Sequence, residues 1–195
     1  TASRVANPGC YATGFLSLVR PLVEKGALSP KARLACHALS GYTGAGKKAI
    51  AQYTDPDRDK ELESPRHYAV TLAHKHLPEM AAIAGLNRPP LFMPMICDYP
   101  QGMVATVPLW AEELEGPWSI EKLRALYEDY YGGSPVVTLR PAGAPSCGFI
   151  GSNNLSGADG LQIFVNGNRG QFMLSARLDN LGKGASGAAV QNMNL

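Results

Sequence analysis

The sequence has no apolar run long enough to cross a membrane, and no charged-then-apolar signal peptide opens it. Charge is also scarce, because only 17% of the residues are charged and the net charge is +2. An excess this small does not favour nucleic acid or an anionic membrane as a partner. We therefore expect a chain that binds neither.

Cysteines are few and widely spaced, with no pairing typical of metal ligands. They are Cys10, Cys36, Cys97 and Cys147. The 195 residues are enough for one well-buried core but few for two full domains, and a chain of this size needs no disulfide bonds. We expect reduced thiols and a cytoplasmic location.

Internal repeats and an initiator methionine are also absent. Residues 1–6 lead directly into the first motif. We expect this sequence to be part of a longer chain, with a segment removed upstream.

The first motif centres on Cys10, which follows a Pro8-Gly9 turn and precedes an apolar-periodic segment. This pattern predicts a helix that begins at Cys10, runs to about Lys25 and ends at Gly26. Unpaired N–H groups and the helix dipole favour a thiolate at that position, so Cys10 is a candidate nucleophile. The alternative is that Cys10 is a small buried hydrophobic residue, as most free cysteines are.

A glycine-rich loop follows a predicted strand at 32–39. Residues 41–48 nearly match a nucleotide-binding P-loop, but Lys48 occupies the position where that motif has a magnesium-binding hydroxyl. We favour a turn that lets the backbone approach another anion, with Lys47 or Lys48 nearby. A plain strand-to-helix turn with solvated lysines remains the alternative.

Two histidines precede a helix that we predict to include Pro78 and to end at Gly85. If the segment is extended, His74 and His76 point to the same side, where they suit either a shared metal or acid–base chemistry. No third metal ligand is evident, so we assign no metal. Surface histidines on a loop are the alternative.

The remaining pattern predicts strands and helices that alternate without a regular order. We expect a surface loop at 52–65, strands at 91–95, 103–109, 136–139, 161–165 and 172–178, a helix at 120–131 and a final helix rich in small residues. The turn residues at 166–170 indicate a hairpin, and Ser119 is a helix cap. This inventory predicts an α+β fold with a mostly antiparallel, mixed sheet and helices packed on one face.

Four segments together resemble N-acetyl-gamma-glutamyl-phosphate reductases, in particular their shorter variant, across nearly the whole chain. They are Asn-Pro-Gly-Cys-Tyr at 7–11, Ser-Gly-Tyr-Thr-Gly-Ala-Gly-Lys-Lys at 40–48, His-Lys-His-Leu-Pro-Glu at 74–79 and Asp-Asn-Leu-Gly-Lys-Gly-Ala at 179–185. Each is weak or moderate alone, but four in this order are specific. Met95 and Gln101 depart from the longer variant, which tends to have His and Arg there.

The resemblance implies a fold like the C-terminal domain of semialdehyde dehydrogenases. Residues 1–178 then form a catalytic and dimerisation domain, and residues 179–195 form a segment and helix that return to an N-terminal NADP-binding domain. No G-x-G-x-x-G segment precedes Cys10, so we expect that domain to be missing from this chain. A homodimer or homotetramer is also implied.

The resemblance further implies an enzyme of arginine biosynthesis that uses NADPH to reduce N-acetyl-glutamyl 5-phosphate to the 5-semialdehyde. Cys10 is then the nucleophile that forms a thioester, and His74 is its acid–base partner. His76, Ser40, Gly41, Lys47 and Lys48 are expected to contact the substrate. Asn180, Gly182 and Gly184 are expected to lie near the nicotinamide.

Two alternatives stay open. One is another acyl-phosphate reductase of the same fold, such as aspartate-semialdehyde dehydrogenase, because the sequence does not settle the chain length of the substrate. As an isolated fragment, the chain is instead a non-catalytic dimerisation module.

Overall fold

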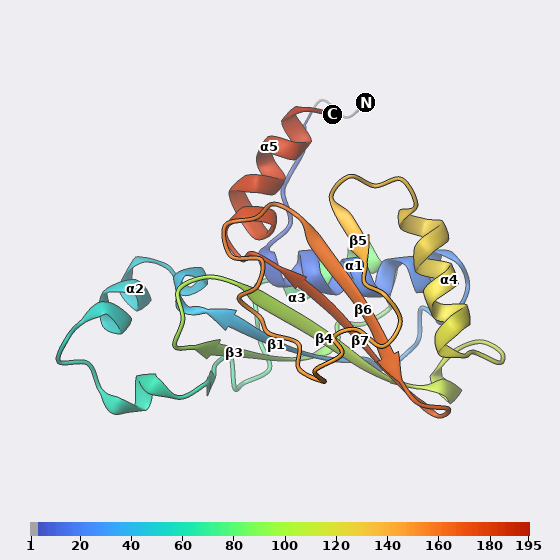
Figure 1. Ribbon diagram of the computed structural model, residues 1–195, viewed down its shortest axis with the longest axis horizontal. Coiled ribbons are helices and arrows are strands. Elements are labelled where there is room, and N and C mark those ends of the chain that lie inside the picture. Colours follow the sequence, from blue (N-terminus) through green and yellow to red (C-terminus); the bar gives the residue numbers. More distant parts are fainter. Residues whose placement is uncertain (1–3) are drawn as a thin grey trace.

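The computed structural model describes residues 4–195 and is built on one seven-stranded sheet, in the order β2-β3-β1-β4-β7-β6-β5 (Figure 1). The strands are β1 (Ala35–Gly41), β2 (Arg66–His67), β3 (Leu91–Cys97), β4 (Met103–Trp110), β5 (Val137–Leu139), β6 (Leu161–Gly167) and β7 (Gln171–Leu178). The β1–β3 and β5–β6 pairs are parallel, and the other pairs are antiparallel. The expected mostly antiparallel, mixed sheet is confirmed.

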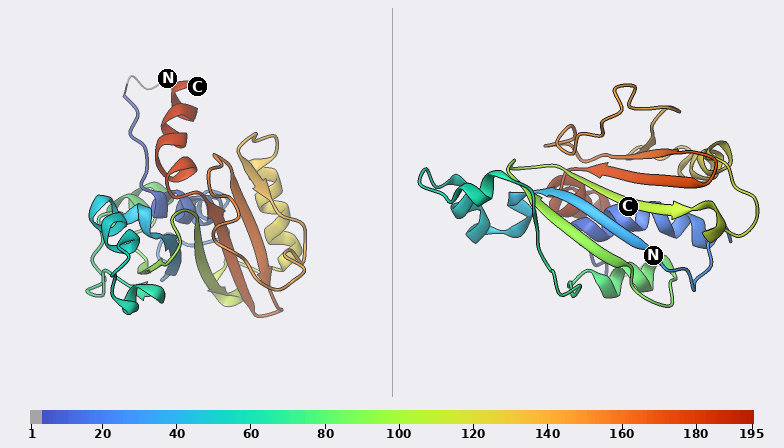
Figure 2. Two further views of the ribbon diagram at one scale, coloured as in Figure 1. Left: turned by 60° about the vertical axis from the view of Figure 1, so that its left-hand side comes forward. Right: turned by 90° about the horizontal axis from the view of Figure 1, so that it is seen from below.

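Three helices pack on one face of the sheet, as the sequence predicted: α1 (Cys10–Glu24), α3 (Leu77–Ala84) and α4 (Ile120–Tyr131) (Figure 2). The other helical elements lie at the periphery. They are α2 (Lys47–Thr54), α5 (Gly187–Met193), short 3-10 turns at Tyr42–Ala45, Lys60–Glu63 and Ala111–Glu113, and a π-helical turn at Gly182–Ser186.

The core lies between α1 and the central strands. Phe15, Leu18 and Leu22 of α1 are fully buried against the sheet. Gly14 sits so close to β4 that a Cβ atom there would lie 2.8 Å from Ala105 Cβ. Gly14 therefore determines how closely α1 packs on the sheet. The same close packing fixes the position of Cys10, at the start of α1, relative to the sheet.

The helix ends follow the predicted caps. Ser119 Oγ accepts a hydrogen bond from Lys122 N–H at 3.2 Å, which satisfies one free donor at the start of α4. Gly26 follows α1 with φ of +69°, and Gly85 ends α3 in the left-handed region. The hairpin turn is also confirmed, because Asn168 Oδ1 accepts from the N–H groups of Gly170 and Gln171.

Two local predictions were partly wrong. The first strand begins at Ala35 and extends to Gly41 instead of spanning 32–39, because pairing with β3 and β4 continues to its end. The expected loop at 52–65 includes the end of α2 and a 3-10 turn. Asp59 Oδ1 starts that turn by accepting a hydrogen bond from the Glu61 N–H at 2.9 Å. The polar composition of the segment, from which we predicted a loop, does not indicate this bond.

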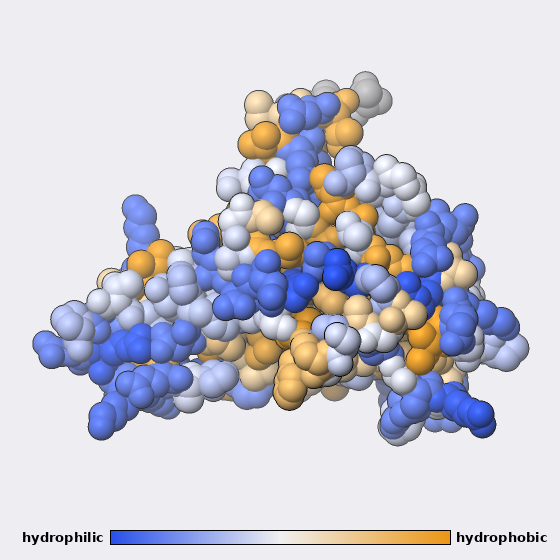
Figure 3. Space-filling model, viewed as in Figure 1, coloured by the Kyte–Doolittle hydropathy of each residue, from blue (hydrophilic) through white to orange (hydrophobic). Residues whose placement is uncertain are grey.

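Within residues 4–195, no helix packs on the second face of the sheet. We call it the bare face and define it by its exposed apolar side chains, which are Leu91, Met93, Trp110 and Met173. On the side of the molecule that faces the viewer of Figure 1, apolar residues are spread between polar ones (Figure 3). Strand pairing places His37 on the same face, next to Met93 and opposite Thr106.

The C-terminal helix α5 stands away from the sheet, beside the N-terminal segment (Figures 1 and 2). Asn192 Nδ2 donates to Asn7 Oδ1 at 2.6 Å and joins the two segments. A division at residue 178 stays a prediction. Within residues 4–195, every helix is too short or too polar to span a membrane.

Candidate functional site

A pocket of about 800 Å³ opens where α1 begins and the loop after β1 starts. Parts of segments 7–11, 44–45, 74–76 and 180–189 line it, together with Tyr68 and Ile96. Four segments far apart in the sequence therefore meet at one point. Cys10, His74, His76, Asn180 and Gly184 are the sequence-predicted site residues that line it.

Cys10 is the first residue of α1, as predicted, and its turn is held from outside the helix. Gly9 N–H donates to the carboxylate of Glu79, at 3.1 Å to Oε1 and 3.4 Å to Oε2. The ring of His76 packs on Gly9 so closely that a Cβ atom there would lie 2.1 Å from His76 Nε2. Only glycine leaves room for an imidazole directly beside the cysteine.

The π-helical turn closes the other side of Cys10. A Cβ atom on Gly184 would lie 2.7 Å from Cys10 Cβ, so the backbone itself forms the wall of the pocket. Ala185 and Ala189 continue this wall with small side chains. This side of the pocket is therefore formed by backbone and methyl groups.

Burial raises the pKa of the Cys10 thiol to about 11. The N–H groups of Tyr11 and Cys10 and the charge of Lys75 lower this pKa, but they do not compensate for the loss of solvent. The start of α1 therefore favours the thiolate, as expected, but burial has the larger effect on the pKa. The thiol needs a base.

The two histidines form a compact cluster with ring centroids 4.7 Å apart, packed against Tyr11. The predicted extended conformation is wrong: His76 has helical φ and ψ, and the segment is a turn leading into α3. His74 Nδ1 accepts the N–H of His76 at 3.2 Å, which places the proton of a neutral His74 on Nε2. His74 Nε2 lies 3.5 Å from the Tyr68 hydroxyl.

Both imidazoles are suited to accept a proton. Burial lowers the pKa of His74, with further lowering by the charges of His76 and Lys75. Burial also lowers the pKa of His76, whose Nδ1 has no hydrogen-bond partner within residues 4–195. At neutral pH both rings are therefore uncharged.

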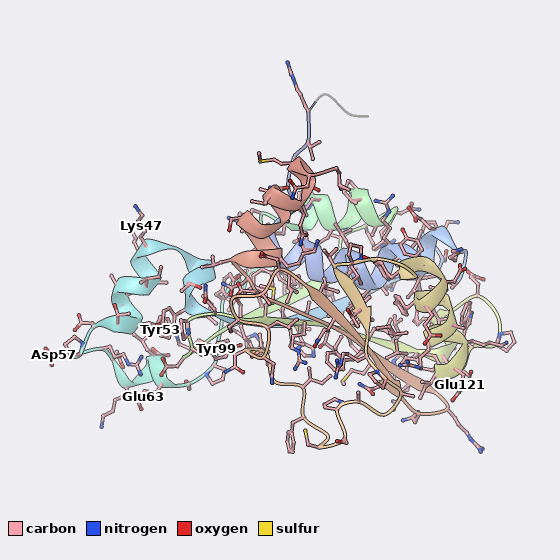
Figure 4. The ribbon with its side chains drawn as sticks, turned by 45° about the horizontal axis from the view of Figure 1, so that its top comes forward. Lys47, Tyr53, Asp57, Glu63, Tyr99 and Glu121 are labelled. Atoms are coloured by element: carbon pink, nitrogen blue, oxygen red, sulfur yellow. The ribbon has the colours of Figure 1, made fainter. Side chains whose placement is uncertain are left out.

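The lysines of the glycine-rich loop do not reach the pocket. Lys47 and Lys48 are exposed and lie outside its lining, and Lys47 projects from the outer side of α2 (Figure 4). Ser40 and Gly41 also lie outside the lining, with the buried Ser40 hydroxyl donating to Gly41 O at 3.1 Å. Gly44 and Ala45 are the loop residues at the pocket.

Asn180 borders the pocket, but its side chain is engaged inside the fold. Its Oδ1 accepts Gly102 N–H at 2.8 Å, and its Nδ2 donates to Thr43 Oγ1 at 3.1 Å. Asn180 thus links the glycine-rich loop to the β3–β4 turn. Because its side chain is engaged in these bonds, only its backbone is available to contact a ligand in the pocket. Gly182 lies outside the lining.

Lys75, Tyr68 and Glu79 were not singled out from the sequence. Lys75 and Tyr68 line the pocket, and Glu79 holds Gly9. Lys75 and Glu79 belong to the segment 74–79, which is one of the four segments that carried the resemblance. Their place in that segment was the sequence feature that could have identified them as site residues. Tyr68 had no such feature, because only the turn at 68–76 folds it back toward His74.

Residues 10–180 match the family model described as semialdehyde dehydrogenase, dimerisation domain. The N-acetyl-gamma-glutamyl-phosphate reductases of Brucella ovis and Brucella canis are each 45% identical to this chain over 201 residues. Those matches cover 100% of the chain and 64% of each relative. The chain thus spans under two thirds of their length, and the resemblance seen in the sequence is confirmed.

Solved structures show the same fold at low identity. Aspartate semialdehyde dehydrogenase II from Vibrio cholerae superposes with a TM-score of 0.69 at 17% identity, over 98% of this chain and 61% of that one. Aspartate semialdehyde dehydrogenase from Francisella tularensis gives 0.68 at 12% identity, over 96% and 64%.

Proposed function

Because this chain belongs to the semialdehyde dehydrogenase dimerisation-domain family, we propose that it carries the catalytic part of an NADPH-dependent N-acetyl-gamma-glutamyl-phosphate reductase. The reaction converts N-acetyl-glutamyl 5-phosphate into N-acetyl-glutamate 5-semialdehyde and phosphate, in arginine biosynthesis in the cytoplasm. The supporting observation is that Cys10 and two uncharged histidines, His74 and His76, line the same pocket.

In the proposed first step, His74 Nδ1 exchanges its hydrogen bond from the His76 N–H for the proton of the Cys10 thiol. The sulfur attacks the acyl carbon, a C–S bond forms, and the carbon–oxygen bond to phosphate breaks. A thioester on Cys10 remains, so one difficult reduction becomes two easier steps. Lys75 is the cation at the pocket, and we assign the departing phosphate to it in place of Lys47 or Lys48.

When bound, NADPH would supply the hydride that reduces the thioester carbon. The Cys10 backbone N–H, at the start of α1, stabilises the oxyanion of the resulting thiohemiacetal, an effect of about 3 kcal/mol per donor. Collapse of that intermediate releases the aldehyde and the Cys10 sulfur, which recovers its proton from His74. His76 is a second polar group in the same pocket.

The wall beside Cys10 suits a nicotinamide ring. The residues at 184, 185 and 189 are glycine or alanine, so these positions present no side chain larger than a methyl group to a ring. The Asn180 backbone and Gly184 would border the ring, with Gly182 behind them. Since the Asn180 side chain is hydrogen-bonded inside the fold, it orients the wall and leaves the pocket free.

The bare face supports a homodimer. Its exposed apolar side chains lie on the sheet side opposite α1, and a groove of about 540 Å³ at one end is bordered by Trp110 and Met173. Packing a second copy of this chain on the face would remove these side chains from water. A homotetramer then needs a second interface elsewhere.

A labelling experiment tests the thioester. The protein is incubated with N-acetyl-glutamate 5-semialdehyde, phosphate and NADP, then quenched in acid and digested. We expect an acyl group on the Cys10 peptide, absent in Cys10→Ser and retained in Cys147→Ser, whose exposed thiol is a matched control. Turnover by Cys10→Ser would rule out the mechanism.

The same preparation separates the alternatives. A panel that includes aspartate 4-semialdehyde reports substrate chain length, and 45% identity to N-acetyl-gamma-glutamyl-phosphate reductases favours the longer N-acetylated substrate. An assay of the 195-residue chain by itself shows whether this chain reduces the substrate without a separate NADP-binding domain. A stable dimer without turnover is the result for a dimerisation module.

A further inference from the structure

Asp179 is a fully buried acid at the end of β7, next to the pocket but outside its lining. Within residues 4–195 no cationic side chain pairs with it. Its Oδ1 accepts the N–H groups of Leu181 at 2.7 Å and Gly182 at 2.9 Å, and its Oδ2 accepts the N–H of Gly157. An acid is expensive to bury unless its oxygens are bonded in this way.

These bonds fold the turn that covers Cys10. The main-chain oxygen of Asp179 accepts Gly184 N–H at 2.8 Å, so side chain and backbone together close residues 179–184 into one turn. Gly184 at the end of this turn is the residue in contact with Cys10 Cβ. The carboxylate is therefore connected to the residue that contacts Cys10 through one short turn, in which the N–H groups of Leu181, Gly182 and Gly184 are all bonded to Asp179.

We propose that Asp179 is a positioning residue for the Cys10 nucleophile: its carboxylate fixes the 181–184 turn as the wall that holds the thiol in place and excludes water from it. The proposal rests on the proposed function, because it takes Cys10 as the nucleophile. Asn180 fixes the same segment to the glycine-rich loop, whereas Asp179 determines the shape of the turn itself.

The substitution Asp179→Asn tests this assignment with little change in size. An amide carries N–H donors in place of one oxygen, so either Gly157 or the pair Leu181 and Gly182 loses its acceptor. The turn then moves away from Cys10, and water reaches the sulfur. In this variant the Cys10 thiol should ionise at a lower pH than in the wild type, and kcat should fall. A substitution that only destabilises the fold does not produce both effects together.

The measurement uses the full-length protein and three readouts: the pH dependence of Cys10 alkylation by iodoacetamide, the kcat and KM of phosphate-dependent NADP reduction, and Tm. For Asp179→Asn we expect the alkylation midpoint to fall by about one pH unit. We expect kcat to fall by about tenfold or more, with KM changed by less than about threefold. Asp57→Asn is the control, because the exposed Asp57 side chain follows α2, away from the 179–184 turn, and accepts no hydrogen bond within residues 4–195.

A lower Tm for Asp179→Asn, with midpoint and kcat as in the wild type, would overturn the proposal. If Asp179→Asn does not fold, Asp179→Ser is measured in the same way, and failure of both to fold also contradicts it. Activity in Cys10→Ser would instead remove the proposed function. The alkylation shift needs no turnover and still decides whether Asp179 positions the thiol.

Discussion

At Cys10 two effects of opposite sign act on the same thiol. Burial raises its pKa from 9.0 to about 11, and two pKa units correspond to about 3 kcal/mol. A helix N-terminus stabilises a negative charge by about 0.3–1 kcal/mol at an exposed position and by up to about 2 kcal/mol when partly buried. Desolvation is therefore the larger effect, and the thiolate forms only when a base removes the proton.

The alkylation profile of the free protein follows from this balance. We expect the Cys10 rate to rise with pH to a midpoint near pH 11, with about one thiol in a thousand ionised at pH 8. Mass spectrometry of each cysteine peptide against pH measures it, and the exposed Cys147 provides the reference. A Cys10 midpoint below that of Cys147 would show that the helix terminus dominates after all.

Replacement of the histidines separates their roles. His74→Asn should lower kcat by about 10²–10⁴-fold, the usual contribution of a general acid–base. His76→Asn should have a smaller effect, and His37→Asn on the bare face should have none on kcat. Steady-state kinetics of the three variants gives the ranking. A larger loss in His76→Asn would transfer the acid–base role to the ring that packs on Gly9.

At the scale of elements, α4 shows how a local signal becomes stability. Ser119 caps its first turn, and the buried Tyr127 hydroxyl donates to Leu18 O in α1. The start of α4 is therefore determined by the local sequence, through the Ser119 cap. Its attachment to α1 depends on the Tyr127 contact, which the sequence alone does not indicate.

We expect Ser119→Ala to reduce the free energy of unfolding by about 1 kcal/mol, because the Lys122 N–H loses its acceptor. Urea denaturation followed by circular dichroism measures this loss. Ser119→Asp keeps an acceptor and should remain close to the wild type. Equal loss in both variants would mean that the hydroxyl acts through something other than the cap.

At the scale of the whole molecule, the sheet has one face closed by helices and one open. We expect Met93→Glu, in β3 on the bare face, to convert a dimer into monomers, since it would bury a charge without a partner. Light scattering during gel filtration measures the mass. Ile83→Glu on α3 is the control, because Ile83 is also apolar and exposed but lies away from that face. A monomeric wild type would exclude the face as an interface.

Acid should destabilise the molecule before its carboxylates titrate. Burial lowers the pKa of His37, His74 and His76 in the folded chain, so below pH 6.5 the unfolded chain binds protons that the folded chain does not. Stability is therefore complete above pH 6.5 and declines as the pH falls below it. Tm from pH 7.5 to 5 measures the decline, which should be shallower in His76→Asn. An unchanged slope in that variant would contradict the assignment.

Much of the fold was predictable, because caps and periodicity act within a few residues. The helix at 120–131 was placed from Ser119 and its apolar spacing, and the last hairpin from Asn168 and its glycines. The first strand was misplaced, since its end depends on pairing with β3 and β4. The turn that holds the histidines was also missed, because Tyr11 and Phe92 pack against those rings from distant elements.

The sequence by itself determined the elements, the family and the pairing of Cys10 with two histidines, because these depend on local patterns and on four short motifs. Only the tertiary structure decided that Lys75 reaches the pocket while Lys47 points away, and that Asn180 turns its side chain inward. It also decided the ionisation of Cys10. Solvent exclusion depends on every segment that surrounds the sulfur, and Gly184, the residue against it, is 174 positions further along the chain.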